Sequence, residues 1–242
     1  MCFTVNVNII KEELEKRYGS ELLDHEKYRP SYYYHAYSYP ELPAVARLSS
    51  GDNQLGLFRW GLIPSWTRSE DEASKIRSMT LNARSESIDE KPAFSGPFAR
   101  RRCLVPVRGF FEWRHEAGKK IPYYIYHPSL PVISLGAVFD RWSTTGGDDV
   151  YSFSIITTKA NRLMSEIHNS KKRMPVIINP NEEDDWLYLG TPASRLKELM
   201  KSYPDNILEA HTISPMIGNS RINRNSSEII KPYDYPVDQT LF

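Results

Sequence analysis

The sequence predicts an α+β fold, with residues 1–242 forming a single domain around a curved, mostly antiparallel sheet or barrel with flanking helices. Three observations favour it. Five segments between residues 104 and 157 read as strands, with turn signals at Gly118 and in the run 144–149. Apolar residues at helical spacing lie before and after these strands. No repeat, low-complexity segment or linker rich in proline and glycine divides the chain.

The first third of the chain begins with an alternating segment, residues 1–7, that predicts a short strand. Residues 8–18 predict a helix, with Asn8 as N-cap and Gly19 as C-cap. The run 29–40 contains five tyrosines, which either form a stacking surface for nucleobases or pack within a loop and the core. Residues 55–63 predict a strand that leads into the turn Pro64-Ser65-Trp66, where a tryptophan is expected to be exposed.

The remaining elements follow from the same patterns. Residues 67–78 are charged and predict a loop or a short helix. The five central strands are expected at residues 104–108, 109–114, 121–127, 132–139 and 151–157. A helix is expected over residues 160–167 with Thr158 as its cap, followed by His168. A strand at 174–178 and helices at 181–189 and 191–202, the last with Pro192 in its first position, complete the prediction.

Composition excludes several classes of protein. Lys and Arg number 31 and Asp and Glu 30, so net charge gives no nucleic-acid signal, and only the runs 100–102 and 171–173 could form a basic surface. Either run could equally be a solvated face. Two cysteines without metal-ligand spacing predict neither a disulfide framework nor a metal or other cofactor. Without a signal peptide or membrane span, the chain is expected in the cytoplasm with reduced thiols.

Glu112 is the most informative polar residue, because it interrupts the aromatic run Gly109-Phe110-Phe111-Glu112-Trp113. In a strand, Phe111 and Trp113 share one face and Glu112 lies on the other. A carboxylate beside aromatic surface has a raised pKa that suits proton transfer near neutral pH. The alternative is an ordinary glutamate on the wet face of a half-buried strand.

Cys2 follows the initiator methionine, and its small side chain permits removal of Met1. A cysteine at the amino terminus carries an α-amine with a pKa near 7.7–8.0 and a thiol with a pKa near 8.5 on adjacent carbons. The amine can form a Schiff base with an aldehyde, and the thiol can then close a thiazolidine ring. On position alone, Cys2 could instead be a buried strand residue.

Several motifs in this order resemble the SOS-response-associated peptidase family, or SRAP domain. They are 59–66 (RWGLIPSW), 81–86 (LNARSE), 91–94 (KPAF), 101–106 (RRCLVP), 109–113 (GFFEW), 167–168 (IH) and 173–177 (RMPVI). The resemblance implies an abasic-site sensor of the DNA damage or SOS response. Such a protein crosslinks covalently to abasic sites in single-stranded DNA after Met1 is removed by autoproteolysis or by an aminopeptidase.

The resemblance also implies roles for individual residues. Cys2, Asn82, Glu112 and His168 are the expected catalytic residues, and the DNA-binding residues are expected to be Arg84, Trp66, Lys91 and Arg173. Cys2 would form the thiazolidine, Asn82 would position the amino terminus and sugar, Glu112 would transfer protons, and His168 would assist sugar opening. The protein is expected to act as a monomer and to associate with the nucleoid when bound to DNA.

Two alternatives remain open from the sequence. One is an N-terminal cysteine peptidase that acts by acyl transfer through the same residues, and the other is a non-catalytic single-stranded DNA-binding module. Two features differ from the common pattern of the family. Phe3 and Thr4 follow Cys2 in place of Gly-Arg, so a basic residue beside the nucleophile is absent, and residues 169–172 lengthen the segment after His168.

Overall fold

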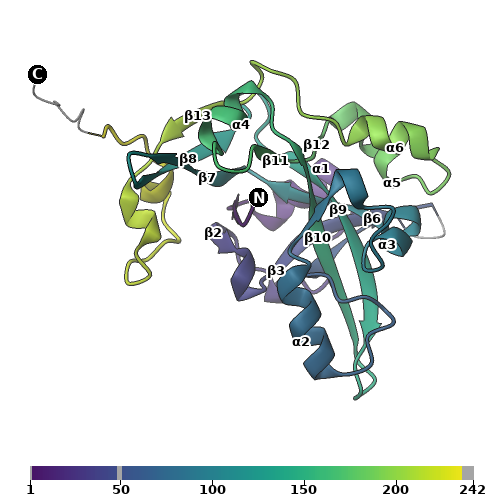
Figure 1. Ribbon diagram of the computed structural model, residues 1–242. Coiled ribbons are helices and arrows are strands. Elements are labelled where there is room, and N and C mark those ends of the chain that lie inside the picture. The colour runs from purple at the N-terminus through teal and green to yellow at the C-terminus, as the bar shows by residue number, and fades with distance from the viewer. Residues whose placement is uncertain (1, 48–50, 236–242) are drawn as a thin grey trace, which may run out of the picture.

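The computed structural model describes residues 2–47 and 51–235, which form two β-sheets with helices around them (Figure 1). The first sheet has five strands in the order β13-β8-β7-β1-β2, and every neighbouring pair is antiparallel. Its strands are β1 Thr4–Val7, β2 Ser31–His35, β7 Gly109–Glu116, β8 Lys119–Tyr126 and β13 Glu209–Thr212. The amino-terminal strand is therefore an interior strand, with β7 on one side and β2 on the other.

The second sheet closes on itself, because β10 pairs with β4 at one edge of the path β4-β3-β6-β9 and with β9 at the other. These strands are β3 Glu41–Arg47, β4 Asn53–Trp60, β6 Arg102–Val107, β9 Ile133–Ser143 and β10 Asp149–Lys159. Three short strands extend it: β5 Asn82–Arg84, β11 Arg173–Pro175 and β12 Ile177–Ile178. Only the pairings of β10 with β4 and β5 are parallel among these named strands. The α+β fold with a curved, mostly antiparallel barrel is thus confirmed.

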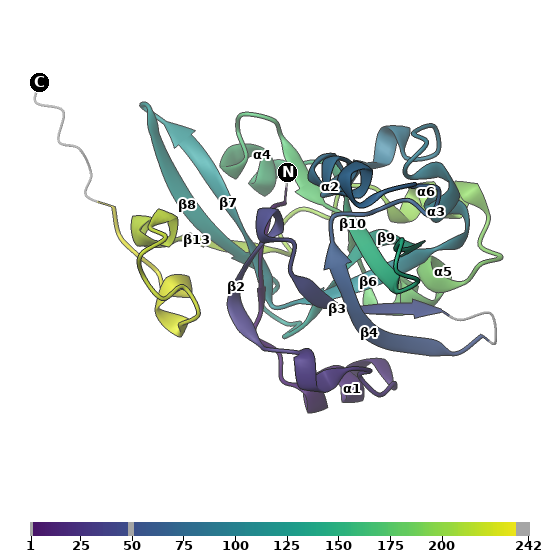
Figure 2. The ribbon, with the colours of Figure 1, turned by 90° about the horizontal axis from the view of Figure 1, so that it is seen from below.

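Short helices surround the sheets. The α-helices are α1 Lys11–Tyr18, α2 Glu70–Met79, α3 Ser95–Arg100, α4 Arg162–Ile167, α5 Glu183–Leu187 and α6 Ala193–Leu199. The 3-10 turns are η1 His25–Lys27, η2 Ala36–Ser38, η3 Ser85–Ser87, η4 Pro180–Glu182, η5 Pro215–Gly218 and η6 Ser227–Ile230. In both ribbon views β2 lies between the β7–β8 hairpin and barrel strand β3 (Figures 1 and 2).

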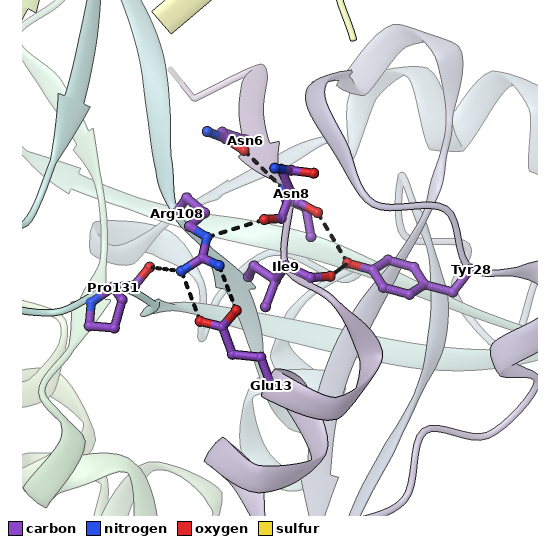
Figure 3. Close-up of polar contacts among 8 residues, drawn as sticks. Asn6, Asn8, Ile9, Glu13, Tyr28, Arg108 and Pro131 are labelled. Atoms are coloured by element: carbon purple, nitrogen blue, oxygen red, sulfur yellow. Dashed lines mark hydrogen bonds and ion pairs between the residues drawn. The ribbon is translucent and has the colours of Figure 1, made fainter. Parts of the chain in front are cut away.

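The segment between β1 and α1 corrects the predicted start of the first helix. Asn8 is not the N-cap: its backbone N–H donates to Asn6 Oδ1 at 2.9 Å, and α1 begins at Lys11. Tyr28 donates its hydroxyl proton to the carbonyl of Ile9 at 2.7 Å, which holds this segment extended (Figure 3). The C-cap is Gly19 as predicted, with a left-handed φ of 64° that glycine adopts without strain.

Arg108, in the bend between β6 and β7, fastens the same segment to the first sheet. Its guanidinium donates to both carboxylate oxygens of Glu13 in α1, to the carbonyl of Asn8 at 3.2 Å and to the carbonyl of Pro131 at 3.1 Å (Figure 3). Planar, bidentate pairing of arginine with a carboxylate is among the stronger polar contacts in proteins. It fixes the end of β1 relative to the start of β7.

Two further predictions needed correction. Thr158 does not cap α4, since it lies within β10, where it pairs with Met174; the cap is Asn161, whose Oδ1 accepts from the N–H of Met164 at 3.0 Å. Strands β2, β3, β5 and β13 were not predicted, and β3 contains Pro43. Proline cannot donate to a ladder, and here β3 pairs with β6 only at Val45 and Ala46, so the Pro43 position has a paired strand on one side only.

Candidate active site

Cys2 lies two residues before the start of β1, and its side chain is completely buried. Strand β1 is held on both sides, with Thr4 opposite His35 in β2 and Val5 opposite Phe110 in β7. Burial and the nearby Glu112 carboxylate raise the pKa of the Cys2 thiol, which is therefore protonated at neutral pH. Met1 is outside the described residues, and its predicted removal remains a prediction.

Glu112 projects from β7 and is only 6% exposed, so it is not a glutamate on a wet strand face. Its neighbour Phe111 is also buried and packs against Tyr124 at a ring distance of 5.2 Å. Burial raises the pKa of the Glu112 carboxyl from 4.5 to about 7. At neutral pH this group therefore both accepts and donates protons, which is the property required of a general acid–base residue.

His168 is the C-cap residue of α4, and its imidazole ring lies close to the Glu112 carboxylate. Its Nδ1 lies 4.0 Å from Glu112 Oε1 and 2.9 Å from the carbonyl oxygen of Arg173. Because a carbonyl only accepts, Nδ1 carries the proton in that contact and Nε2 is the basic nitrogen. Burial lowers the pKa of His168 to about 4, so the imidazole is neutral at physiological pH.

Glu112 and His168 line one cavity of about 600 Å³, which we call the Glu112 cavity. Phe3, directly after Cys2, lines the same cavity, as does Trp113. Three cations, Lys120, Lys171 and Arg224, also contribute to its wall. The sequence did not single out Arg224 or Lys120, because only the fold brings the carboxy-terminal segment and the β7–β8 hairpin to this cavity.

Asn82 lies on β5, where it is opposite Ile155 of β10, and it lines a second cavity of about 580 Å³. Within residues 2–47 and 51–235, neither polar atom of its buried side-chain amide has a hydrogen-bond partner. Leaving such groups unsatisfied costs about 1–3 kcal/mol each, so an amide in this state is typical of a ligand-binding position. We call this space the Asn82 cavity.

Three of the four residues expected to contact DNA come together in the Asn82 cavity. Trp66, Arg84 and Lys91 line it, and all three are exposed. Trp66 is 52% exposed, as its place beside a proline turn predicted. The cavity thus combines two cations with a large aromatic face, which suits phosphate and base contacts along a nucleic-acid strand.

Arg173, the fourth expected DNA contact, lies in a different environment. It is buried, and its guanidinium donates to the Glu86 carboxylate and to the carbonyl of Thr157. The backbone carbonyl of Arg173 accepts the hydrogen bond from His168 Nδ1. Its partner Glu86 is two residues after Arg84, which lines the Asn82 cavity. Arg173 therefore connects the walls of the Glu112 and Asn82 cavities, and its guanidinium is directed into the protein.

The predicted basic run at residues 100–102 does not form a continuous basic surface. Arg102 is 2% exposed and donates to the carbonyls of Trp186, Phe98 and Tyr188. Arg101 pairs with the buried Asp140, its Nε lying 3.1 Å from Oδ1.

Among the residues that the structure describes, no group of three or more His, Cys, Asp or Glu could hold a metal ion. No helix in the described part is long and apolar enough to cross a membrane.

Comparison with known proteins gives this arrangement a family context. The chain is 34% identical over 216 residues to the abasic site processing protein YoqW of Bacillus subtilis (strain 168), which covers 88% of this chain and 91% of that protein. It is 33% identical over 248 residues to the mouse abasic site processing protein HMCES, covering 87% of this chain and 67% of the relative.

A solved structure has the same fold. A crystal structure of a protein from Bacteroides thetaiotaomicron matches with a TM-score of 0.90 and 37% identity, covering 96% of this chain and all of the other. The profile of the SOS response associated peptidase family matches residues 1–220, which include both cavities apart from Arg224. The chain therefore belongs to the SOS response associated peptidase (SRAP) family.

Proposed function

We propose that this protein processes abasic sites in single-stranded DNA by linking Cys2 covalently to the ring-opened sugar. The relatives YoqW and HMCES are named as abasic site processing proteins. The observation that carries the proposal is the position of Glu112, a buried carboxyl with a pKa of about 7, beside Cys2. An aldehyde that condenses with an amine and a thiol needs a nearby group that gives and takes protons at neutral pH.

The reaction begins once Met1 has been removed. The α-amine of Cys2 attacks the aldehyde carbon, and loss of one water gives an imine. The Cys2 sulfur then adds to the imine carbon, and the nitrogen gains a proton, which closes a five-membered thiazolidine. Glu112 donates a proton to the departing hydroxyl and accepts one from the thiol. Burial and Glu112 raise the pKa of the Cys2 thiol in the chain that carries Met1, and a base beside the thiol favours ring closure.

The other residues act on the sugar and the strand. A neutral His168, with its basic nitrogen at Nε2, accepts the hydroxyl proton when the sugar ring opens. The unsatisfied amide of Asn82 orients the amino terminus and the sugar. Arg84 and Lys91 bind phosphates, and Trp66 stacks on a base. Arg173 holds His168 and Glu86 in position from behind the site.

Peptidase chemistry would use the same residues differently. A cysteine peptidase attacks with a thiolate, which is stabilised by an electropositive environment that lowers the thiol pKa. Around Cys2 the opposite holds, since burial and Glu112 raise that pKa. This environment supports a mechanism that begins at the α-amine.

The experiment weighs the intact protein after incubation with abasic single-stranded DNA, with and without borohydride. The processed wild-type chain is expected to gain a stable DNA-sized mass. Cys2→Ala keeps the amine and should give an adduct only with borohydride, and Cys2→Ser should behave similarly. Cys103→Ala removes the other buried thiol and is the matched control. Protein that retains Met1 has no free amine on Cys2 and should form neither product.

Each alternative predicts a different result. Equal crosslinking by the form that retains Met1 would refute the amine-first mechanism. Cleavage of a peptide without a DNA adduct would establish acyl transfer in its place. Tight DNA binding with no adduct under either condition would show that the protein is a non-catalytic DNA-binding module.

A further inference from the structure

The tyrosine-rich stretch folds into a row of aromatic rings along β2 and η2. Tyr33 and His35 lie on the same face of β2. Their ring centroids are 6.2 Å apart, and the ring planes are only 8° from parallel. Tyr37 continues the row from η2, 5.6 Å from His35. We call these three rings the aromatic row. Within residues 2–47 and 51–235, β2 is an edge strand of the first sheet, and the carboxy-terminal segment lies against it, where Asn225 Oδ1 accepts from the N–H of Tyr32 at 3.0 Å.

The aromatic row starts beside the nucleophile. Phe3, the residue after Cys2, contacts Tyr37 at a ring distance of 5.3 Å. The backbone holds this junction, because the N–H of Ala36 donates to the carbonyl of Phe3 at 2.8 Å. The row therefore runs outward from the position of Cys2 along elements that do not contribute to the Asn82 cavity.

A cation caps the far end of the row. The Arg224 guanidinium lies 4.2 Å from the Tyr33 ring centroid and donates to the Tyr33 hydroxyl at 3.0 Å. Arg224 and the three rings line a hollow of about 460 Å³ that shares Tyr33, His35 and Arg224 with the Glu112 cavity. Burial and Arg224 lower the pKa of His35, which keeps that imidazole neutral and suited to stacking.

Exposure and spacing indicate how a ligand would contact the row. Tyr37 is 53% exposed, although burying an aromatic ring of this size is favourable. Neighbouring ring centroids are 5.6 and 6.2 Å apart, which leaves too little room for a flat group between the rings, so a ligand stacks on their outer side. A planar group joined to an anion satisfies both the rings and Arg224, and repeated units of that kind occur in single-stranded nucleic acid.

We propose that the aromatic row and Arg224 form a second base-stacking track, which holds the nucleotides on one side of the lesion while Trp66 holds those on the other side. This inference rests on the proposed function, because it takes single-stranded DNA as the ligand. It assigns the tyrosine-rich stretch to substrate binding and gives Arg224, at the far end of the row, the place of a phosphate or stacking contact.

The test measures equilibrium binding of fluorescein-labelled, undamaged single-stranded DNA by anisotropy. Tyr37→Ala is expected to weaken binding at least about five-fold, the effect of losing one stacked base. Arg224→Gln should lower the salt dependence by about 0.7 in the log–log slope. Tyr188→Ala is the matched control, since Tyr188 is 58% exposed and is the C-cap residue of α5. Helix α5 lies across the barrel from β2 (Figure 1).

A second arm locates the two tracks with DNA that carries a tetrahydrofuran abasic analogue at one end, which has no aldehyde and cannot crosslink. Tyr37→Ala should weaken binding of strands that extend to one side of the analogue, and Trp66→Ala those that extend to the other. Equal loss on both sides for each variant would overturn the assignment of two tracks. Undiminished binding of undamaged DNA by Tyr37→Ala and by His35→Ala would overturn the inference altogether.

These readouts are independent of the covalent reaction. Loss of binding in Tyr37→Ala supports the stacking track whether or not wild-type protein forms an adduct with abasic DNA. Absence of that adduct in wild-type protein that binds through Tyr37 would refute the proposed function and leave the track in place.

Discussion

Replacing Glu112 by Gln tests whether burial raises the pKa of this carboxyl in the folded protein. In the folded protein burial raises its pKa from 4.5 to about 7. Between these two values the unfolded chain has lost this proton and the native protein keeps it, so the native state binds more protons and stability falls as pH rises. From about pH 5 to about pH 8 this effect is about 2–3 kcal/mol. Glu112→Gln should not show this fall in stability with pH.

Urea denaturation of both proteins at these two pH values measures the effect. The free energy of unfolding of Glu112→Gln, minus that of the wild type, should rise by about 2–3 kcal/mol between about pH 5 and about pH 8. Glu90→Gln alters an exposed glutamate and should show no such rise. An unchanged difference would mean that Glu112 ionises as an ordinary carboxyl and that the argument from burial is wrong.

The same variant tests catalysis. Glu112→Gln keeps the shape of the side chain but cannot transfer a proton, so single-turnover crosslinking should slow by about 10²–10⁴-fold while DNA affinity is retained. Since the α-amine also titrates near pH 8, the informative quantity is the ratio of wild-type to variant rates. That ratio should change between about pH 6 and about pH 8, where Glu112 passes from mostly protonated to mostly ionised. A constant ratio would remove Glu112 from the mechanism.

Four further substitutions separate binding, positioning and packing. Arg84→Ala should weaken DNA binding across sequences and lower the log–log salt slope by about 0.7, with little change in urea stability; an unchanged slope would contradict a phosphate contact. Arg173→Ala should instead lower stability by about 1–3 kcal/mol, because the buried Thr157 carbonyl loses its donor, and leave the salt slope unchanged. Gly109→Ala should lower the melting temperature markedly, since a Cβ there would be 2.4 Å from the Ile125 carbonyl oxygen, whereas Gly56→Ala, with 3.5 Å to its nearest neighbour, should change it little.

Local patterns predicted the strands that make up most of the two sheets, because alternation and turn residues determine them within a few positions. The hairpin glycine Gly118 has a φ of 76°, as a turn requires. Strand β3 escaped prediction, since whether Pro43 is tolerated depends on which strands lie beside it. The closure of the barrel through β10 likewise depends on pairings between residues far apart in the chain.

Sequence motifs singled out several residues of the candidate site but not how the fold groups them. Motifs identified Glu112 and His168, and the fold brings them within 4.0 Å. No sequence pattern indicated that Asn82 would line a different cavity with Trp66, or that the Arg173 guanidinium would be turned into the protein. Arg224 was missed because its approach to Tyr33 depends on the course of the carboxy-terminal segment.

The interior position of β1 also sets the order of events during synthesis. Val5 pairs with Phe110, so about 105 residues must be made after β1 before its partner β7 exists, which takes about 5–20 s at ordinary rates of translation. The antiparallel pair of β1 and β2, which α1 and η1 separate in the chain, is too small to be stable alone. We therefore expect the amino end to remain accessible on the ribosome during this interval. Once β7 joins, Cys2 is completely buried. If an aminopeptidase removes Met1, we expect it to act on the nascent chain before β7 joins. Faster synthesis of this region should then increase the share of protein that keeps Met1.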